Sequence, residues 1–266
     1  TINHSMNDKL ARVSPVSRVT LASPLLWLIR GWRDFVRHPL PGLLHGLCVT
    51  LFGALLYAVA DQQFWLLVGA FSGFLLVAPV LATGLYAVSR ELERDRLMSL
   101  AELVALWRGR DSRLVGFGLL LCLAGTAWVL TSASLMVLLA PAPINTVVDF
   151  LRHVVLSESP LLFEFWVLLG GLLAAPIFAS SVLTLPMLID RDCLPINAVR
   201  ASWRAVADHP LVLAFWASLI ACLVLVGLLS FLLGLLVVVP LLAHASWHAY
   251  RDLSASASAA SAVGGR

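Results

Sequence analysis

Three histidines have the residue type and the spacing that could hold a metal ion or a haem in this 266-residue chain. His244 and His248 are four residues apart, so on a helix they share one face. His45 lies near the start of the first long apolar run, at about the same depth as His244 in the last one. Imidazoles in this arrangement can ligate zinc, copper or haem, and Cys48 could add a thiolate.

A structural role for the same histidines is the alternative that the sequence favours. His244 and His248 could hydrogen-bond backbone or hydroxyl groups across helices, as polar side chains in membrane helices do. No carboxylate is positioned to complete a metal site with these histidines. Asp34 is expected to pair with Arg30 or Arg37 on its own helix, since residues three or four apart are neighbours there, and contact with a partner is the alternative. A cofactor is therefore not required, and haem or metal binding remains an alternative.

The elements that must position these residues are transmembrane helices. Hydrophobic residues make up 60% of the chain, charged residues only 12%, and the mean hydropathy is +0.93, which excludes an ordinary soluble domain. The last apolar run is long enough for two helices, with a turn expected near Gly227 to Gly234. We therefore predict an all-α bundle of six transmembrane helices. The charge-free runs are at about 40–60, 64–88, 114–140, 161–189 and 211–250.

Basic residues predict the orientation of the bundle. Of the 18 Lys and Arg residues, 17 lie on one side of the predicted spans and only Arg152 lies on the other. The positive-inside rule then places both termini in the cytoplasm. The same rule explains the net charge of +3 without a nucleic-acid partner, so membrane lipids are the expected contact. Residues 1–23 are expected to form a cytoplasmic segment without a cleaved signal peptide, and 254–266 a flexible tail.

A short amphipathic segment ending in Trp-Arg recurs before each odd-numbered span. The three copies are PLLWLIRGWR at 24–33, SLAELVALWR at 99–108 and PINAVRASWR at 195–204. Each is expected to form a helix lying in the headgroup layer, followed by a transmembrane hairpin. Residues 24–253 would then be three repeats of about 24–98, 99–194 and 195–253. The expected interfacial anchors are Trp32, Arg33, Trp107, Arg108, Trp203, Arg204, Trp247 and Tyr250.

Proline and small residues within the spans predict close packing around a centre. Pro79, Pro176 and Pro240 are expected to kink the second span of each repeat. Four glycines are expected at helix contacts: Gly42, Gly46, Gly69 and Gly73. If the kinks surround a cavity, its lining would include Thr83, Ser180, Ser181 and Ser246.

The two ends of the predicted bundle carry a resemblance. GWRDFVRHPLPGLLHG at 31–46 and HASWHAYRD within 240–253 are similar to the ends of a bacterial family of predicted integral membrane proteins. The resemblance implies six spans, a place in a bacterial inner membrane and no established activity.

Function is predicted mainly by exclusion. The chain has no P-loop, HExxH, GxSxG or dinucleotide-binding motif, so it is not expected to be an enzyme. We expect an accessory, assembly or scaffold subunit of a larger membrane complex, with a membrane protein as its partner. A channel or carrier for a small neutral or hydrophobic solute is the first alternative, and a haem or metal protein using His45, His244 and His248 is the second.

Overall fold

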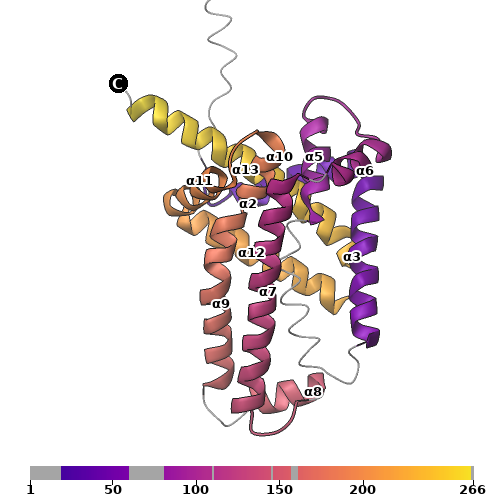
Figure 1. The fold of residues 1–266 in the computed structure, drawn as a ribbon, viewed down its shortest axis with the longest axis vertical. Helices are drawn as coiled ribbons and strands as arrows, with labels where there is room; N and C mark the ends of the chain where they lie inside the picture. Colours follow the sequence, from indigo (N-terminus) through magenta and orange to yellow (C-terminus); the bar gives the residue numbers. More distant parts are fainter. Residues whose placement is uncertain (1–18, 60–80, 110, 145, 157–160, 265–266) are drawn as a thin grey trace, which may run out of the picture.

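The chain folds into a helical bundle (Figure 1). The computed structural model describes residues 19–59, 81–109, 111–144, 146–156 and 161–264. All secondary structure in these ranges is helical, as the composition predicts. The helices are α2 (Ser23–Arg37), α3 (Pro39–Val59), α5 (Thr83–Leu92), α6 (Leu100–Arg108), α7 (Ser112–Leu139), α8 (Val147–Phe150) with the wider turn η1 (Leu151–Val155), α9 (Leu162–Ser181), α10 (Thr184–Asp190), α11 (Pro195–Asp208), α12 (Pro210–Leu229) and α13 (Leu235–Gly264).

The three Trp-Arg segments form the helices that the sequence predicts. Helices α2 and α11 have a proline in their first turn, where its missing N–H costs no helical hydrogen bond. Helix α6 begins with a capping box, because the Ser99 hydroxyl accepts from the N–H of Glu102 while the Glu102 carboxylate accepts from the N–H of Ser99. Local residue chemistry therefore sets the start of each helix.

Helices α2, α6 and α11 lie at one end of the bundle, beside α5 and α10 (Figure 1). We call these three helices the platform. Helices α7 and α9 run away from the platform and are connected at the far end through α8 (Figure 1). The platform is the arrangement expected of interfacial helices that precede transmembrane helices.

Four stretches of the described chain are long and apolar enough to cross a membrane. They are Pro39–Ala58, Ser112–Leu139, Leu162–Asp190 and Pro210–Leu229. They correspond to the first, third, fourth and fifth predicted spans. Most of the second predicted span, with Gly69, Gly73 and Pro79, lies outside the described residues. Helix α13, the predicted sixth span, forms but is more polar than these four.

Two of the prolines predicted to kink their spans do not interrupt their helices. Helix α9 continues through Pro176 and ends at Ser181, and α13 continues through Pro240. The fourth span is instead interrupted between Ser181 and Thr184. Pro186 causes this break, because it has no N–H to donate to the carbonyl of the residue four before it. The N–H of Leu183 turns aside to the Ser202 hydroxyl of α11, at 3.1 Å.

The last apolar run folds back at the expected place. Helix α12 ends at Leu229 and α13 begins at Leu235, within the turn predicted from the two glycines. The described residues of the predicted tail from Ser254 are helical, since α13 continues to Gly264. Serine and alanine extend a helix that has already nucleated at little cost, and alanine has the highest helix propensity.

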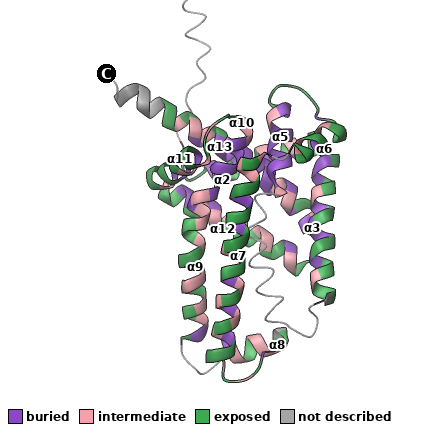
Figure 2. Ribbon diagram, in the orientation of Figure 1, coloured by how far each residue is buried: buried purple, intermediate pink, exposed green. Residues whose placement is uncertain are grey.

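The core lies where the platform meets α13. Trp27, Trp216, Trp247 and Tyr250 are fully buried there, and the rings of Trp27 and Trp216 contact edge to face at 5.6 Å. Figure 2 shows buried residues gathered near α2, α5 and α13, whereas α7 and α9 are mostly exposed or half-buried along their length. The exposed residues on α7 and α9 include many leucines, as expected of surfaces that face lipid.

Candidate functional site

Four polar side chains from three helices meet inside the core. They are Asp34 of α2, Ser89 of α5, and His244 and His248 of α13, and we call them the Asp34 cluster. Nε2 of His248 lies 2.9 Å from Oδ2 of Asp34, and Oγ of Ser89 lies 2.7 Å from the same oxygen. Nδ1 of His244 lies 2.7 Å from Oγ of Ser89. The cluster joins segments that are far apart in the sequence.

Donors and acceptors in this cluster determine where the protons sit. Ser89 has one hydroxyl proton and donates it to Asp34, so Nδ1 of His244 must donate to Ser89. His248 donates from Nε2 to the same carboxylate. Nε2 of His244 is buried and has no partner among the described residues, so in the neutral ring it is a bare acceptor. The two histidines therefore stabilise the ionised carboxylate of Asp34.

The pKa of Asp34 follows from this arrangement. Burial alone raises it, but the hydrogen bonds from His248 and Ser89, with the charges of His248 and His244, outweigh burial and lower the pKa below its ordinary value. Asp34 is thus a buried negative charge, which is costly unless it is paired. The partners that lower its pKa also hold α2 and α5 against α13.

The expectation that Asp34 pairs within its own helix is wrong. Arg30 instead forms an ion pair with Asp252 of α13, and Arg37 donates to Asp95 at 3.0 Å. Asp34 adjoins the buried face of α2 that Trp27 and Phe35 occupy, so its carboxylate points inward. The position of Asp34 next to this apolar face of α2 was the feature of the sequence that could have predicted an inward-pointing carboxylate. Ser89 carried no comparable signal.

The structure does not bring the three histidines that could hold a metal ion or a haem together around one point. Nδ1 of His45 donates to the carbonyl of Pro41 at 2.8 Å, and His45 makes no hydrogen bond with the Asp34 cluster. Across the described ranges, no group of three or more His, Cys, Asp or Glu residues has an arrangement that could hold a metal ion. His244 and His248 are brought together, but around a carboxylate.

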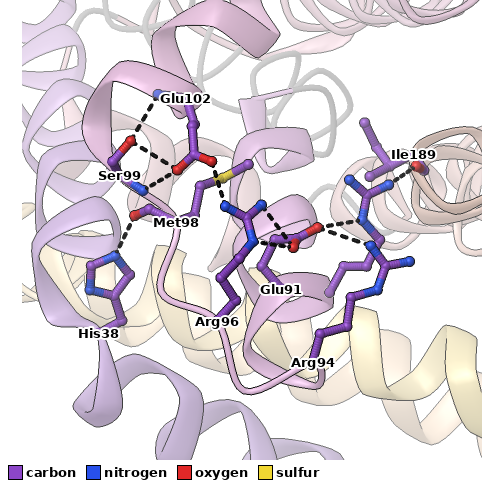
Figure 3. A network of polar contacts seen from close by, with 9 residues as sticks. His38, Glu91, Arg94, Arg96, Met98, Ser99, Glu102 and Ile189 are labelled. Atoms are coloured by element: carbon purple, nitrogen blue, oxygen red, sulfur yellow. Dashed lines mark hydrogen bonds and ion pairs between the residues drawn. The ribbon is translucent and has the colours of Figure 1, made fainter.

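Charged side chains also tie α5 to the platform helix α6. Glu91 of α5 accepts from Arg94 and Arg96, and Arg96 continues to Glu102 of α6 (Figure 3). Burial raises the pKa of Glu91, but the hydrogen bond from Arg96 and the charges of Arg96, Arg90 and Arg94 lower it by more. The pKa of Glu91 is therefore below its ordinary value. The backbone N–H of Ser99 and the Arg96 guanidinium lower the pKa of Glu102 to about 2.

Two backbone carbonyls extend this network to neighbouring helices. Nε2 of His38, between α2 and α3, donates to the carbonyl of Met98 at 2.8 Å (Figure 3). Arg90 of α5 donates to the carbonyl of Ile189 in α10. The connection between α5 and α6 is therefore held in place although it contains no regular helix.

The predicted anchors divide into two groups. Trp32, Trp107 and Trp203 are 47%, 46% and 47% exposed, so each can reach a headgroup layer. The arginines that follow them are exposed too: Arg33, Arg108 and Arg204. Trp247 and Tyr250 are wrong as anchors, because both are fully buried. Apolar periodicity marks the buried face of a membrane helix as readily as its lipid face.

The tight helix contacts are made by glycine. A Cβ added at Gly46 would lie 2.5 Å from the carbonyl oxygen of Leu236, and one at Gly42 would lie 2.9 Å from Cβ of Pro240. The first two predicted glycines therefore lie where α3 packs on α13, and Pro240 serves this contact. Gly31 allows an equally close contact between α2 and α13, because a Cβ added there would lie 2.6 Å from the backbone nitrogen of Ala245.

Comparison with known proteins agrees with the spans and the apolar surface. Residues 66–190, nearly half of the chain, match a family described as predicted integral membrane protein (DUF2189). This chain is a multi-pass integral membrane protein. The match lies between the two terminal segments on which the resemblance was noted. No curated protein and no solved structure matches the chain.

This membrane protein has an apolar pocket between α3 and α6, with a volume of about 740 Å³. We call it the α3–α6 pocket. The described residues on its wall are Leu44, His45, Cys48, Val49, Phe52, Leu81, Leu103, Val104, Trp107, Arg108 and Val239. None of the four predicted cavity residues lies on this wall. Ser180, Ser181 and Ser246 instead donate to carbonyls of their own helices, and Thr83 is buried.

Proposed function

We propose that this protein is a non-enzymatic scaffold or accessory subunit of a larger complex in the bacterial inner membrane. In this proposal it has six spans, made of three platform-helix and hairpin repeats, and both termini are cytoplasmic. The platform lies in the cytoplasmic headgroup layer. Membrane helices of another protein are the partner.

The observation that carries this proposal is that the buried charged side chains pair with other side chains of the same chain. Asp34 is paired with His248, Asp252 with Arg30, and Glu91 with arginines around it. Asp190 accepts from the buried Tyr250 hydroxyl at 2.6 Å. Such pairs fix helices relative to one another, since they join α2 and α10 to α13 and hold the segment between α5 and α6. A chain whose buried charges serve its own architecture is suited to presenting a rigid surface.

The outer faces of α7 and α9 form an exposed apolar surface that suits a partner. Leu138 is 77% exposed on α7, and Leu168 and Leu172 are 71% and 69% exposed on α9. Between the two helices, Trp166 donates to the Ser132 hydroxyl at 2.8 Å, and Gly170 approaches Trp128. The α7–α9 pair is thus fixed internally and apolar externally, so it can pack against further helices in the bilayer.

Co-purification from the native membrane tests the proposal. The tagged protein, extracted in mild detergent, should carry other membrane subunits at a fixed stoichiometry when the mixture is identified by mass spectrometry. Leu172→Trp, on the exposed face of α9, should reduce this recovery, whereas Leu211→Trp, 72% exposed on α12, should leave it unchanged. A monodisperse protein that is recovered alone and has catalytic activity would overturn the proposal.

A carrier or channel for a small hydrophobic solute is the second candidate, and the α3–α6 pocket favours it. Its volume is in the range of ligand sites, and its wall is almost entirely apolar. Flux of such a solute into proteoliposomes, lost when Leu103→Trp fills the pocket, would support this candidate. Equal flux with and without the protein would contradict it.

A further inference from the structure

The α3–α6 pocket differs from an ordinary lipid-facing groove in the polar groups at one side of it. Three residues supply them: His45 of α3, and Trp107 and Arg108 at the end of α6. The other described residues of the wall are aliphatic, apart from Cys48 and Phe52. A molecule that fits this wall must have a long apolar part and a polar part at the platform end.

Hydrogen bonding within the protein leaves these polar groups available. A carbonyl only accepts, so His45 donates from Nδ1 to Pro41, and Nε2 of the neutral ring is left as an acceptor. An ideal Cβ at Gly84 would lie 2.9 Å from both Nε2 of His45 and Nε1 of Trp107. An acceptor and a donor therefore converge beside Gly84. Nε1 of Trp107 has no partner in the part of the chain that the structure describes.

Arg108 supplies a positive charge at the same place. Arg94, Arg96 and Arg113 are all paired with carboxylates, whereas Arg108 has no acidic partner among the described residues. It lies in the last turn of a platform helix, at the level where headgroups are expected. The pocket thus offers one unpaired guanidinium above an apolar space.

We propose that the α3–α6 pocket binds one anionic glycerophospholipid, such as phosphatidylglycerol. The phosphate pairs with Arg108, an ester carbonyl accepts from Nε1 of Trp107, a headgroup hydroxyl donates to Nε2 of His45, and an acyl chain lies along Leu44, Val49 and Val104. A lipid fits better than a soluble anion because most of the wall is apolar. It fits better than a zwitterionic lipid such as phosphatidylcholine because the described wall has no carboxylate to pair with a cationic headgroup.

The platform provides matched controls, since Trp32-Arg33 and Trp203-Arg204 occupy the corresponding positions of α2 and α11 and do not line this pocket. The purified full chain would be mixed with equal amounts of phosphatidylglycerol and phosphatidylcholine and analysed by native mass spectrometry. The wild type should retain one phosphatidylglycerol in preference to phosphatidylcholine. Arg108→Gln should weaken this retention about fivefold, the effect of one basic residue at an anionic surface, and Arg204→Gln less than about twofold.

A second variant tests the apolar half of the site. Val104→Trp fills the pocket and keeps Arg108, so it should also weaken retention of phosphatidylglycerol. Equal losses for Arg108→Gln and Arg204→Gln would overturn the proposal, because the attraction would then be general to the platform. Unchanged retention in Val104→Trp would overturn it too, as would displacement of the lipid by soluble glycerol phosphate.

Discussion

His248 donates to Asp34 across 214 positions of the sequence, at a distance of 2.9 Å. The bond joins the last helix of the chain to the first platform helix. Both side chains are largely buried, with 10% and 15% of their side-chain surface exposed. A contact of this kind closes the bundle, since it forms only when α2 and α13 are side by side.

Asp34→Asn should therefore destabilise the protein. The substitution keeps the shape of the side chain and removes the charge that orients His248, which costs about 3 kcal/mol when a buried pair is broken. The melting temperature, followed by fluorescence-detected gel filtration, should fall by roughly 6 °C. Asp208→Asn is the control, because Asp208 is exposed and has no acidic or basic partner in the described ranges. Equal melting of the two variants would show that the pair contributes nothing.

The stability that Asp34 supplies should depend on pH at the acid end. Its folded pKa is below the ordinary value of 3.8, so its contribution is complete above that value and is lost as the pH falls through the folded pKa. The difference in melting temperature between wild type and Asp34→Asn should be constant down to about pH 5 and should shrink below about pH 4. A difference that shrinks between about pH 6 and 8 would instead point to titration of a histidine.

Local elements of this fold are predictable from sequence because their causes are local. The amphipathic period and the Ser99-Glu102 capping box lie within a few residues of the helices that they specify. The Asp34 cluster depends on which faces of α2, α5 and α13 meet, and no short segment encodes that. A soluble protein would separate buried from exposed faces by polarity.

In a bilayer, polarity does not separate buried faces from exposed faces. The wrong prediction of two aromatic residues as interfacial anchors illustrates this. Trp247 and Tyr250 have the amphipathic character of interfacial anchors, yet they pack in the core with ring centroids 5.4 Å apart. Lipid and protein interior are both apolar, so residue type does not distinguish a residue that faces one from a residue that faces the other.

The contact of α3 with α13 should be intolerant of any side chain at Gly46. In Gly46→Ala the new Cβ would lie 2.5 Å from the carbonyl oxygen of Leu236 and 2.7 Å from its Cα, so the backbone of α13 must move. Overpacking of this kind costs about 1 to 3 kcal/mol. Gly116→Ala in α7 is the control, because a Cβ there meets no atom within 4 Å. The two should differ in melting temperature, Gly116→Ala being neutral or slightly stabilised; a harmless Gly46→Ala would show that the two helices lie further apart.

Cysteine accessibility should decide whether α12 and α13 cross the bilayer as a hairpin. In a background without the four native cysteines, Ser230→Cys places one thiol in the turn between the two helices. Ala207→Cys places another on the exposed surface of α11, in the platform. A membrane-impermeant maleimide should label Ser230→Cys in intact spheroplasts and Ala207→Cys only after lysis, because the positive-inside rule places the platform in the cytoplasm. The turn is markedly apolar, with Phe231 90% exposed, so failure to label Ser230→Cys from either side would place the turn within the bilayer and remove the sixth span.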